Sequence, residues 1–280
     1  MLAYRHQFHA GNFADVFKHA LLVRLLLALH GKDKPFVYLD THAGVGRYDL
    51  EHAWARKNAE FRGGIARIFD AGDVPPLAAP YLEAVRAENP DGRLRYYPGS
   101  PRIARRFLRA GDRAVLSELN KKDCAALQEL FARDRQVVVR LMDGYQSLKA
   151  HLPPKERRGL VLIDSSFDRA REFERLAEAL QDAHARWATG IYALWFPLME
   201  PAAMRAFERH IVASGIRRIL WLELRLQPGR DADKLTGCGM VVVNPPYRFA
   251  GEATSLLDWL RRVLAPAGGG SAHCRTLVGE

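Results

Sequence analysis

The feature of this sequence that most constrains its fold is the regular alternation of short apolar runs with helical patterns. Near-continuous apolar runs such as Leu160-Val161-Leu162-Ile163 are typical of strands buried on both faces of a mostly parallel sheet. The alternation therefore predicts an α/β fold with seven strands. These strands are expected at residues 35–40, 113–118, 137–143, 159–164, 190–197, 218–226 and 239–244.

Helical patterns fill the gaps between the runs, at residues 14–29, 101–108, 121–133, 169–187 and 202–214. Near the end of the chain, Gly268-Gly269-Gly270-Ser271 predicts a flexible connector before a short tail.

One gap is too long for a single crossover helix. Residues 41–112 separate the first two strands, about twice the length that such a helix needs, and turn residues such as Gly63-Gly64 and Pro75-Pro76 interrupt them. A chain of 280 residues lies near the upper limit for one hydrophobic core. We therefore predict an inserted helical subdomain at residues 48–97, within a domain formed by residues 1–47 and 98–280.

The composition excludes a disordered chain, because 48% of the residues are apolar and only 26% are charged. The longest apolar run, residues 20–29, contains Arg24 and is too short to span a bilayer, and we recognise no signal peptide. Cys124, Cys238 and Cys274 form no CxxC pair, so reduced thiols are expected. These observations predict a cytoplasmic protein with no membrane partner.

The net charge of +10 indicates attraction to polyanions, since each phosphate that a Lys or Arg neutralises releases counterions. Nucleic acid is the partner that this charge favours. The charge alone is equally compatible with an enzyme whose surface is merely basic.

An acid precedes a pair of glycines after the first predicted strand, where Asp40 is followed by Gly44-Val45-Gly46. Such glycines let the backbone approach a ligand closely at the carboxyl edge of a sheet. A dinucleotide site would have its acid about twenty residues later and a third glycine at the position of Asp49. The pattern instead suits S-adenosylmethionine, although a tight turn without a ligand would have the same spelling.

Each of the next three strands also ends in an acid, namely Glu118, Asp143 and Asp164. These carboxylates suit the ribose hydroxyls of the cofactor, its adenine amino group and the substrate, respectively. The alternative for each is a cap on the following helix. Four acids beside a glycine turn favour a class I S-adenosylmethionine-dependent methyltransferase, with a Rossmann-like seven-stranded sheet.

Asp164-Ser165-Ser166-Phe167 stands where methyltransferases that act on amino groups carry Asp/Asn-Pro-Pro-Tyr/Phe. A side-chain oxygen and a backbone carbonyl there accept the two N–H groups of an exocyclic amine, and the aromatic ring stacks on the base. Asp164 and Phe167 keep these side-chain roles, whereas the two serines lack the rigidity of prolines.

A second copy of the motif, Asn244-Pro245-Pro246-Tyr247, follows the seventh predicted strand. That strand normally runs antiparallel and delivers its end to the opposite edge of the sheet. We therefore prefer Asp164 as the catalytic residue and interpret the downstream prolines as a strand terminator.

The N-terminal segment, residues 4–19, places aromatic residues among basic ones ahead of a helix. Such a segment can stack a base and hold a phosphate. A metal site at His6, His9 and His19 is disfavoured, because no cysteine or carboxylate pattern supports it. The alternative for Lys18 and His19 is an exposed helix face.

With these motifs in place, the whole chain resembles the bacterial family of 23S ribosomal RNA adenine-N6-methyltransferases J. The resemblance rests on these strings: Tyr4-Arg5-His6, His9-Ala10-Gly11-Asn12, Lys18-His19, Tyr38 to Gly44, Arg95 to Pro101, Asp143-Gly144, Tyr192 to Trp195 and Asn244-Pro245-Pro246. It implies methylation of the N6 amino group of an adenine in 23S ribosomal RNA, with S-adenosylmethionine as the cofactor.

The resemblance also implies roles for individual residues. The expected cofactor contacts are His19, His42, Ser100, Glu118, Asp143, Gly144 and Asp164. Asp164 is the expected catalytic residue, and Tyr4, His6 and Lys18 serve catalysis or the substrate adenine, with Phe167 stacking on that base. The family pattern at this turn is Asp-Pro-Pro-Tyr, so Ser165, Ser166 and Phe167 are departures from it.

The adenine must leave its stack to react, so unpaired regions of free or immature RNA are the expected target. Two alternatives stay open. One is a DNA adenine methyltransferase, and the other is a nucleic-acid-binding protein in which the two serines have abolished catalysis.

Overall fold

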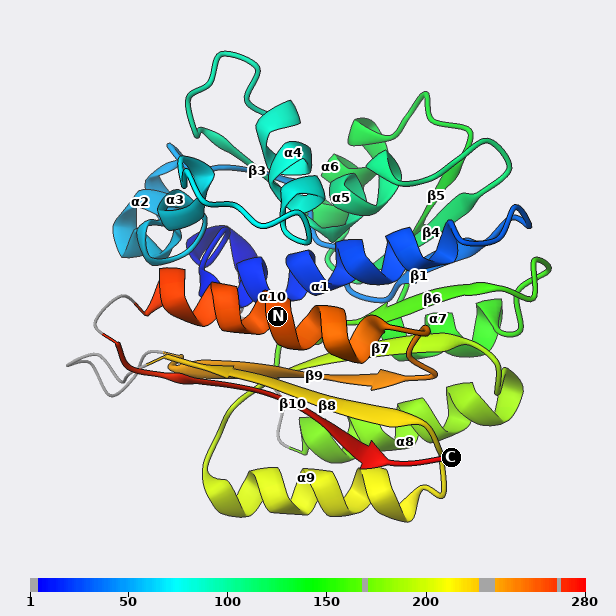
Figure 1. The fold of residues 1–280 in the computed structure, drawn as a ribbon. Coiled ribbons are helices and arrows are strands. Elements are labelled where there is room, and N and C mark those ends of the chain that lie inside the picture. Colours follow the sequence, from blue (N-terminus) through cyan, green and yellow to red (C-terminus); the bar gives the residue numbers. More distant parts are fainter. Residues whose placement is uncertain (1–4, 168–170, 227–234, 266–267) are drawn as a thin grey trace.

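A single mixed sheet forms the centre of the computed structural model, which describes residues 5–167, 171–226, 235–265 and 268–280. From one edge to the other its order is β5-β4-β1-β6-β7-β9-β8-β10 (Figure 1). The first five strands in this order are parallel, and the remaining pairings are antiparallel. The bounds are β1 Val37–Asp40, β4 Arg113–Glu118, β5 Val137–Leu141, β6 Gly159–Ile163, β7 Ile191–Pro197, β8 Ile219–Arg225, β9 Gly237–Val243 and β10 Ser271–Val278.

The seven predicted strands and the parallel-dominated sheet are therefore confirmed, but the predicted short tail is wrong. Ser271 begins β10, which pairs antiparallel with β8 from Ser271 opposite Arg225 to Val278 opposite Ile219. The glycines predicted a connector, but the strand that follows them has too weak an apolar pattern to be predicted from the sequence. An edge strand has one neighbour to satisfy and tolerates such a pattern.

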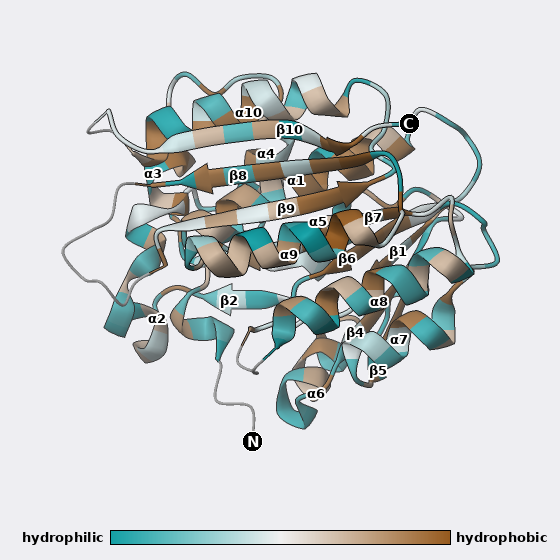
Figure 2. Ribbon diagram, turned by 90° about the horizontal axis from the view of Figure 1, so that it is seen from below, coloured by the Kyte–Doolittle hydropathy of each residue, from teal (hydrophilic) through white to brown (hydrophobic). Residues whose placement is uncertain are grey.

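Helices cover both faces of the sheet, and each face has its own apolar core. The helices α1 (Phe13–Leu29), α5 (Ser100–Arg106), α6 (Lys121–Leu130) and α10 (Phe249–Leu264) contribute to the core on one face. The helices α7 (Gly144–His151), α8 (Glu172–Arg186) and α9 (Pro201–Ala213) cover the other (Figure 1). Hydrophobic residues run along the strands between these layers (Figure 2).

The helix α1 is buried almost all round, because it packs against α10 and α5 and touches the insert. Asn12 begins it by accepting the Asp15 amide at 3.0 Å, as an N-cap residue does. Lys18 and His19 are only 5% and 1% exposed, so the alternative of an exposed helix face is wrong. Burial of α1 brings its polar residues to the inside of the molecule.

The long gap after β1 contains four short helices between two paired strands. The strands β2 (Arg47–Asp49) and β3 (Tyr96–Pro98) are antiparallel and lie at the two boundaries of the predicted insert. Between them lie α2 (Ala53–Asn58), η2 (Glu60–Gly63), α3 (Ile65–Phe69) and α4 (Ala79–Ala87). Buried residues of these helices share one core with α1, so the division into domains stays a prediction.

The insert is fixed closely against the N-terminal segment, which forms the short helix η1 (His6–Phe8). The Ile65 amide donates to the Gly11 carbonyl at 2.8 Å. A Cβ atom on Gly64 would lie 2.2 Å from that same Gly11 oxygen, so only glycine permits this approach. Across the described ranges, no helix has the length and apolarity needed to cross a membrane.

Candidate active site

A cavity of about 1180 Å³ opens at the carboxyl edge of the parallel strands. This is the edge at which open α/β sheets bind ligands. Tyr4 lies outside the described residues, so its predicted role stays a prediction. The cavity is lined by the other predicted site residues: His6, Lys18, His19, His42, Ser100, Glu118, Asp143, Gly144, Asp164 and Phe167.

The glycine turn after β1 has the left-handed backbone that glycine permits, with φ of +62° at Gly44 and +78° at Gly46. The Gly44 amide donates to Glu118 Oε2 at 2.8 Å, and the Asn120 amide donates to Glu118 Oε1 at 2.7 Å. Burial raises the pKa of the Glu118 carboxyl. Each carboxylate oxygen can accept further hydrogen bonds, so Glu118 can still bind hydroxyl groups of a ligand.

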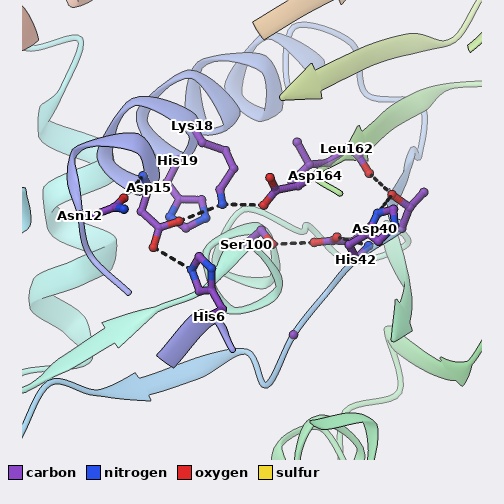
Figure 3. Close-up of polar contacts among 12 residues, drawn as sticks. His6, Asn12, Asp15, Lys18, His19, Asp40, His42, Ser100, Leu162 and Asp164 are labelled. Atoms are coloured by element: carbon purple, nitrogen blue, oxygen red, sulfur yellow. Dashed lines mark hydrogen bonds and ion pairs between the residues drawn. The ribbon is translucent and has the colours of Figure 1, made fainter. Parts of the chain in front are cut away.

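Asp40 lies below the cavity and is fully buried. Its Oδ2 accepts a hydrogen bond from the Tyr38 hydroxyl at 2.7 Å. It also accepts one from the Ser100 hydroxyl, at 2.7 Å (Figure 3). Burial raises the pKa of Asp40 to about 6. The first of the four strand-end acids therefore holds Ser100 at the cavity wall and is not among the residues that line the cavity.

The wall beside β1 and β5 combines His42, Asp143 and Gly144. Thr41 Oγ1 lies 2.8 Å from His42 Nδ1, and burial lowers the pKa of the His42 imidazole. Asp143 caps α7 by accepting the Tyr145 amide at 3.0 Å, and it also lines the cavity. A Cβ atom on Gly144 would lie 2.4 Å from the Thr41 carbonyl oxygen, which explains the glycine.

A chain of charged contacts leads from the end of β6 to the N-terminal segment (Figure 3). Lys18 Nζ donates to Asp164 Oδ2 at 2.6 Å and to Asp15 Oδ1 at 2.8 Å. The other oxygen of this carboxylate, Asp15 Oδ2, lies 2.9 Å from His6 Nε2 and accepts a hydrogen bond from the Gly11 amide at 2.9 Å. One ammonium group therefore joins two carboxylates from α1 and from the predicted catalytic turn.

The charges in this chain stabilise one another. Burial alone would lower the pKa of the Lys18 ammonium, but Asp15 and Asp164 outweigh burial and raise it. Burial alone would raise the pKa of Asp15, but His6 and Lys18 hold it well below its usual value. Lys18 is thus a cation and Asp15 an anion at neutral pH.

His19 points to a second network, away from the ion pairs. Its Nδ1 lies 2.7 Å from the Tyr97 hydroxyl, which lies 3.0 Å from the Tyr81 hydroxyl. Burial holds the pKa of His19 well below its usual value, so the ring is neutral at neutral pH. Within the described residues, its buried Nε2 has no hydrogen-bond partner.

The turn after β6 directs Phe167 against other aromatic rings. Phe167 has a φ of +52°, and its ring centroid lies 4.9 Å from that of Phe173 and 6.0 Å from that of Trp195. Phe167 and Trp195 both line the cavity. The turn thus places a carboxylate and an aromatic ring in the same cavity without the two prolines.

The second motif lies at the opposite edge of the sheet, as predicted. Val243, the last residue of β9, pairs with Tyr192 near the start of β7. Asn244 Nδ2 donates to the Ala188 and Gly190 carbonyls, both at 2.8 Å. This asparagine therefore closes the loop before β7 and is remote from the carboxyl edge.

Two contributions to the site were missed in the sequence. Asp15 stands three residues before Lys18 on a helix, a spacing that pairs side chains, and this signal was available. Tyr145 and Glu172 also line the cavity, with the Tyr145 hydroxyl donating to Glu172 Oε1 at 2.6 Å. No local pattern marks that second pair, because α7 and α8 meet only in the folded chain.

The three N-terminal histidines each contact another side chain. His6 contacts Asp15, His9 Nδ1 lies 2.9 Å from Glu60 Oε1, and His19 contacts Tyr97. In the part of the chain that the structure describes, no three His, Cys, Asp or Glu residues are grouped to hold a metal ion.

Comparison with known proteins reveals full-length relatives. The family described as "Ribosomal RNA large subunit methyltransferase D, RlmJ" matches residues 33–276. A protein of Escherichia coli (strain K12) named ribosomal RNA large subunit methyltransferase J is 43% identical over 280 residues, 100% of both chains. A protein of the same name from Haemophilus influenzae is 43% identical over 272 residues, 97% of both chains.

Solved structures share the fold of this chain. A protein from Legionella pneumophila is 37% identical and has a TM-score of 0.89. The superposition covers 96% of this chain and 98% of that one. A probable spermidine synthase from Corynebacterium glutamicum has a TM-score of 0.51 at 12% identity, covering 96% of this chain and 77% of that one, and shows the fold alone. From the family match and the full-length relatives, we conclude that the chain belongs to the RlmJ family of ribosomal RNA large subunit methyltransferases.

Proposed function

We propose that this chain methylates the N6 amino group of an adenine in 23S ribosomal RNA. As a member of the family, the chain is a methyltransferase, and S-adenosylmethionine is its cofactor. It has the predicted class I fold with one additional strand, β10. The observation that carries the finer proposal is the Asp164 carboxylate, held by Lys18 in the cavity that the predicted cofactor residues line.

The cavity fits the cofactor chemically. S-adenosylmethionine supplies a methyl group on a positively charged sulfur. Glu118 offers carboxylate oxygens beside the glycine turn, and the buried His19 Nε2 has no hydrogen-bond partner among the described residues. Both groups suit a ligand that carries hydroxyl and amino groups, and we assign them, with His42, Ser100 and Asp143, to cofactor binding.

Asp164 orients the amino group of the substrate adenine. This amine is a poor nucleophile, because its lone pair is delocalised into the ring. Two acceptors for its N–H groups localise the lone pair and aim it, and such positioning supplies much of the rate. Since Lys18 donates to Asp164 Oδ2, we assign Oδ1 to one N–H and the Ser165 carbonyl to the other.

Phe167 stacks on the extruded adenine, and the two serines replace the prolines of the family turn. The contacts of Phe167 with Phe173 and Trp195 fix the turn from one side, and the ion pair of Asp164 with Lys18 fixes it from the other. These contacts support an active turn without prolines. Lys18 holds Asp164 directly in the orientation that the amine needs, and His6 supports Lys18 through Asp15.

The partner is an unpaired region of 23S ribosomal RNA, free or immature. The relatives named for the large ribosomal subunit support this substrate, and the net charge of +10 favours binding to a polyanion. An adenine in a duplex must be unstacked before it can enter a buried site, whereas an unpaired one enters at lower cost.

The decisive experiment compares Asp164→Ala with Asn244→Ala. Single-turnover transfer of a labelled methyl group to Escherichia coli 23S ribosomal RNA transcribed in vitro should be abolished by Asp164→Ala. It should be nearly unchanged in Asn244→Ala, apart from lower stability. Mapping the label to N6 of one adenine completes the test.

Other outcomes would identify another function. An active Asp164→Ala beside an inactive Asn244→Ala would assign catalysis to the second motif. Faster transfer to a DNA oligonucleotide of matched sequence would identify a DNA methyltransferase. A wild-type protein that binds both cofactor and RNA without turnover would be a binding protein that has lost catalysis.

A further inference from the structure

The surface around α2 has features that the methyl-transfer site does not use. We call it the α2 surface and define it by Phe8, Trp54, Arg56, Lys57 and Arg62. It lies beside the mouth of the active-site cavity, because Lys57 lines that cavity. A role for this surface in holding the RNA substrate rests on the proposed function.

An exposed stack of aromatic rings forms one part of the α2 surface. Trp54 is 44% exposed although its ring lies parallel to that of Phe8, with centroids 5.2 Å apart and planes at 14°. The ring of His52 also packs against that of Trp54 in a T-shaped arrangement, with centroids 5.4 Å apart. Such a large exposed aromatic residue, fixed in place by its neighbours, is typical of a site that stacks a base or binds a partner.

Three exposed cations form the second part of the α2 surface. Arg56, Lys57 and Arg62 are exposed, and none of them has an ion pair with another described residue. The acids nearby in the sequence have other partners: Glu60 lies 2.9 Å from His9, and Glu51 lies within 4 Å of Arg93 and Arg95. The α2 surface therefore carries excess positive charge.

A second hollow, of about 430 Å³, lies beside two of these cations. Arg56 and Arg62 line it beside the apolar side chains of Leu50, Phe61 and Leu94. Glu51 lines it as well, and Arg93 and Arg95 compensate its charge. Ala59, between α2 and η2, lines both this hollow and the active-site cavity. A chain of nucleotides that leaves the cavity across Ala59 thus meets cations next to apolar contacts.

We propose that the α2 surface binds the unpaired nucleotides next to the target adenine. Trp54 stacks on one base, and Arg56 and Arg62 bind backbone phosphates at the second hollow. Lys57 binds the phosphate nearest the cavity. Aromatic stacking and phosphate contacts tolerate any sequence, so this surface supplies affinity and direction for a single strand rather than base recognition.

The test measures binding of a short fluorescein-labelled single-stranded RNA by fluorescence anisotropy. Trp54→Ala should weaken binding by roughly 5- to 150-fold, as loss of one stacked base does, whereas Trp54→Phe should restore most of the affinity. The double variant Arg56→Ala, Arg62→Ala should reduce the slope of log affinity against log salt by about 1.4, the value for two phosphate contacts to a single strand.

Two matched controls remove groups of the same kind elsewhere. Tyr247→Ala removes an aromatic side chain that is 91% exposed beyond β9, and Arg186→Ala with Arg217→Ala removes two exposed cations. Neither control should change RNA affinity by more than about twofold. Calorimetric affinity for S-adenosylmethionine should be unchanged in every variant, which shows that each one is folded.

Equal losses in the controls and in the α2 variants would overturn the proposal, because they would show non-specific binding. Unchanged affinity in Trp54→Ala and in the double arginine variant would overturn it as well. Failure of the proposed function would give a different result. The wild type would methylate no RNA, while the α2 variants would still lose RNA affinity. That result would support the binding surface and contradict the proposed reaction.

Discussion

One ammonium group at the centre of the site connects residues that lie far apart in the sequence. Lys18 holds Asp164 at 2.6 Å and Asp15 at 2.8 Å, and the three side chains are mostly buried. Removing one member of a buried ion pair leaves a charge without a partner and typically costs about 3–5 kcal/mol. The site is therefore constrained electrostatically before any ligand binds.

Asp40 makes the stability of the folded protein depend on pH. Burial raises its pKa to about 6, above the usual value of 3.8, so the folded protein binds this proton more tightly than the unfolded chain. The contribution of Asp40 to stability is therefore fully present below pH 3.8 and is lost as the pH rises through about 6.

We expect the difference in unfolding free energy between wild type and Asp40→Asn to depend on pH. Asparagine does not titrate, so wild type should lose stability relative to the variant between about pH 4 and pH 7, by up to about 3 kcal/mol. Chemical denaturation across this range measures the difference. A constant difference would mean that Asp40 has an ordinary pKa in the folded protein.

At the scale of single elements, β10 determines how the sheet ends. It covers β8 over its whole length and packs against α10. Without it, the backbone groups of β8 would lie exposed at the edge of the sheet, where another chain could pair with them.

Deleting residues 271–280 should therefore lower the melting temperature by roughly 5–15 °C, which corresponds to a loss of several kcal/mol, and should promote aggregation. Calorimetry and light scattering measure the two effects. Removal of Glu280 alone, which lies beyond the end of β10, is the control and should change little. A truncated protein as stable as wild type would show that β10 adds no stability.

The net positive charge of the whole molecule should make binding of RNA, but not binding of the cofactor, depend on salt. RNA affinity should fall steeply with salt, with a slope of about −0.7 for each phosphate contacted in a single strand. Affinity for the cofactor should hardly change, because its contacts are local and lie inside the cavity. Titrations at several salt concentrations measure both slopes, and equal slopes would contradict a role of the basic surface in RNA binding.

The succession of strands and helices, and the residues at the carboxyl edge, follow from local sequence signals. Apolar periodicity, glycines and strand-end acids are local signals, and parallel strands bring such ends together at one edge. For this reason Glu118, Asp143 and Asp164 could be placed in one cavity, and Asn244 could be assigned to the opposite edge, without coordinates.

The partners of the buried charges, by contrast, depend on how the elements pack in three dimensions. Lys18 could be an exposed helix residue by its pattern, yet packing of α1 between α10 and α5 leaves it 5% exposed between two carboxylates. Asp40 resembles a ligand residue, yet it is absent from the cavity lining and holds Ser100 at the cavity wall. These contacts join residues that are 60 and 146 positions apart, so no local pattern encodes them. A buried charge needs a partner, and the fold determines which group lies close enough to be that partner.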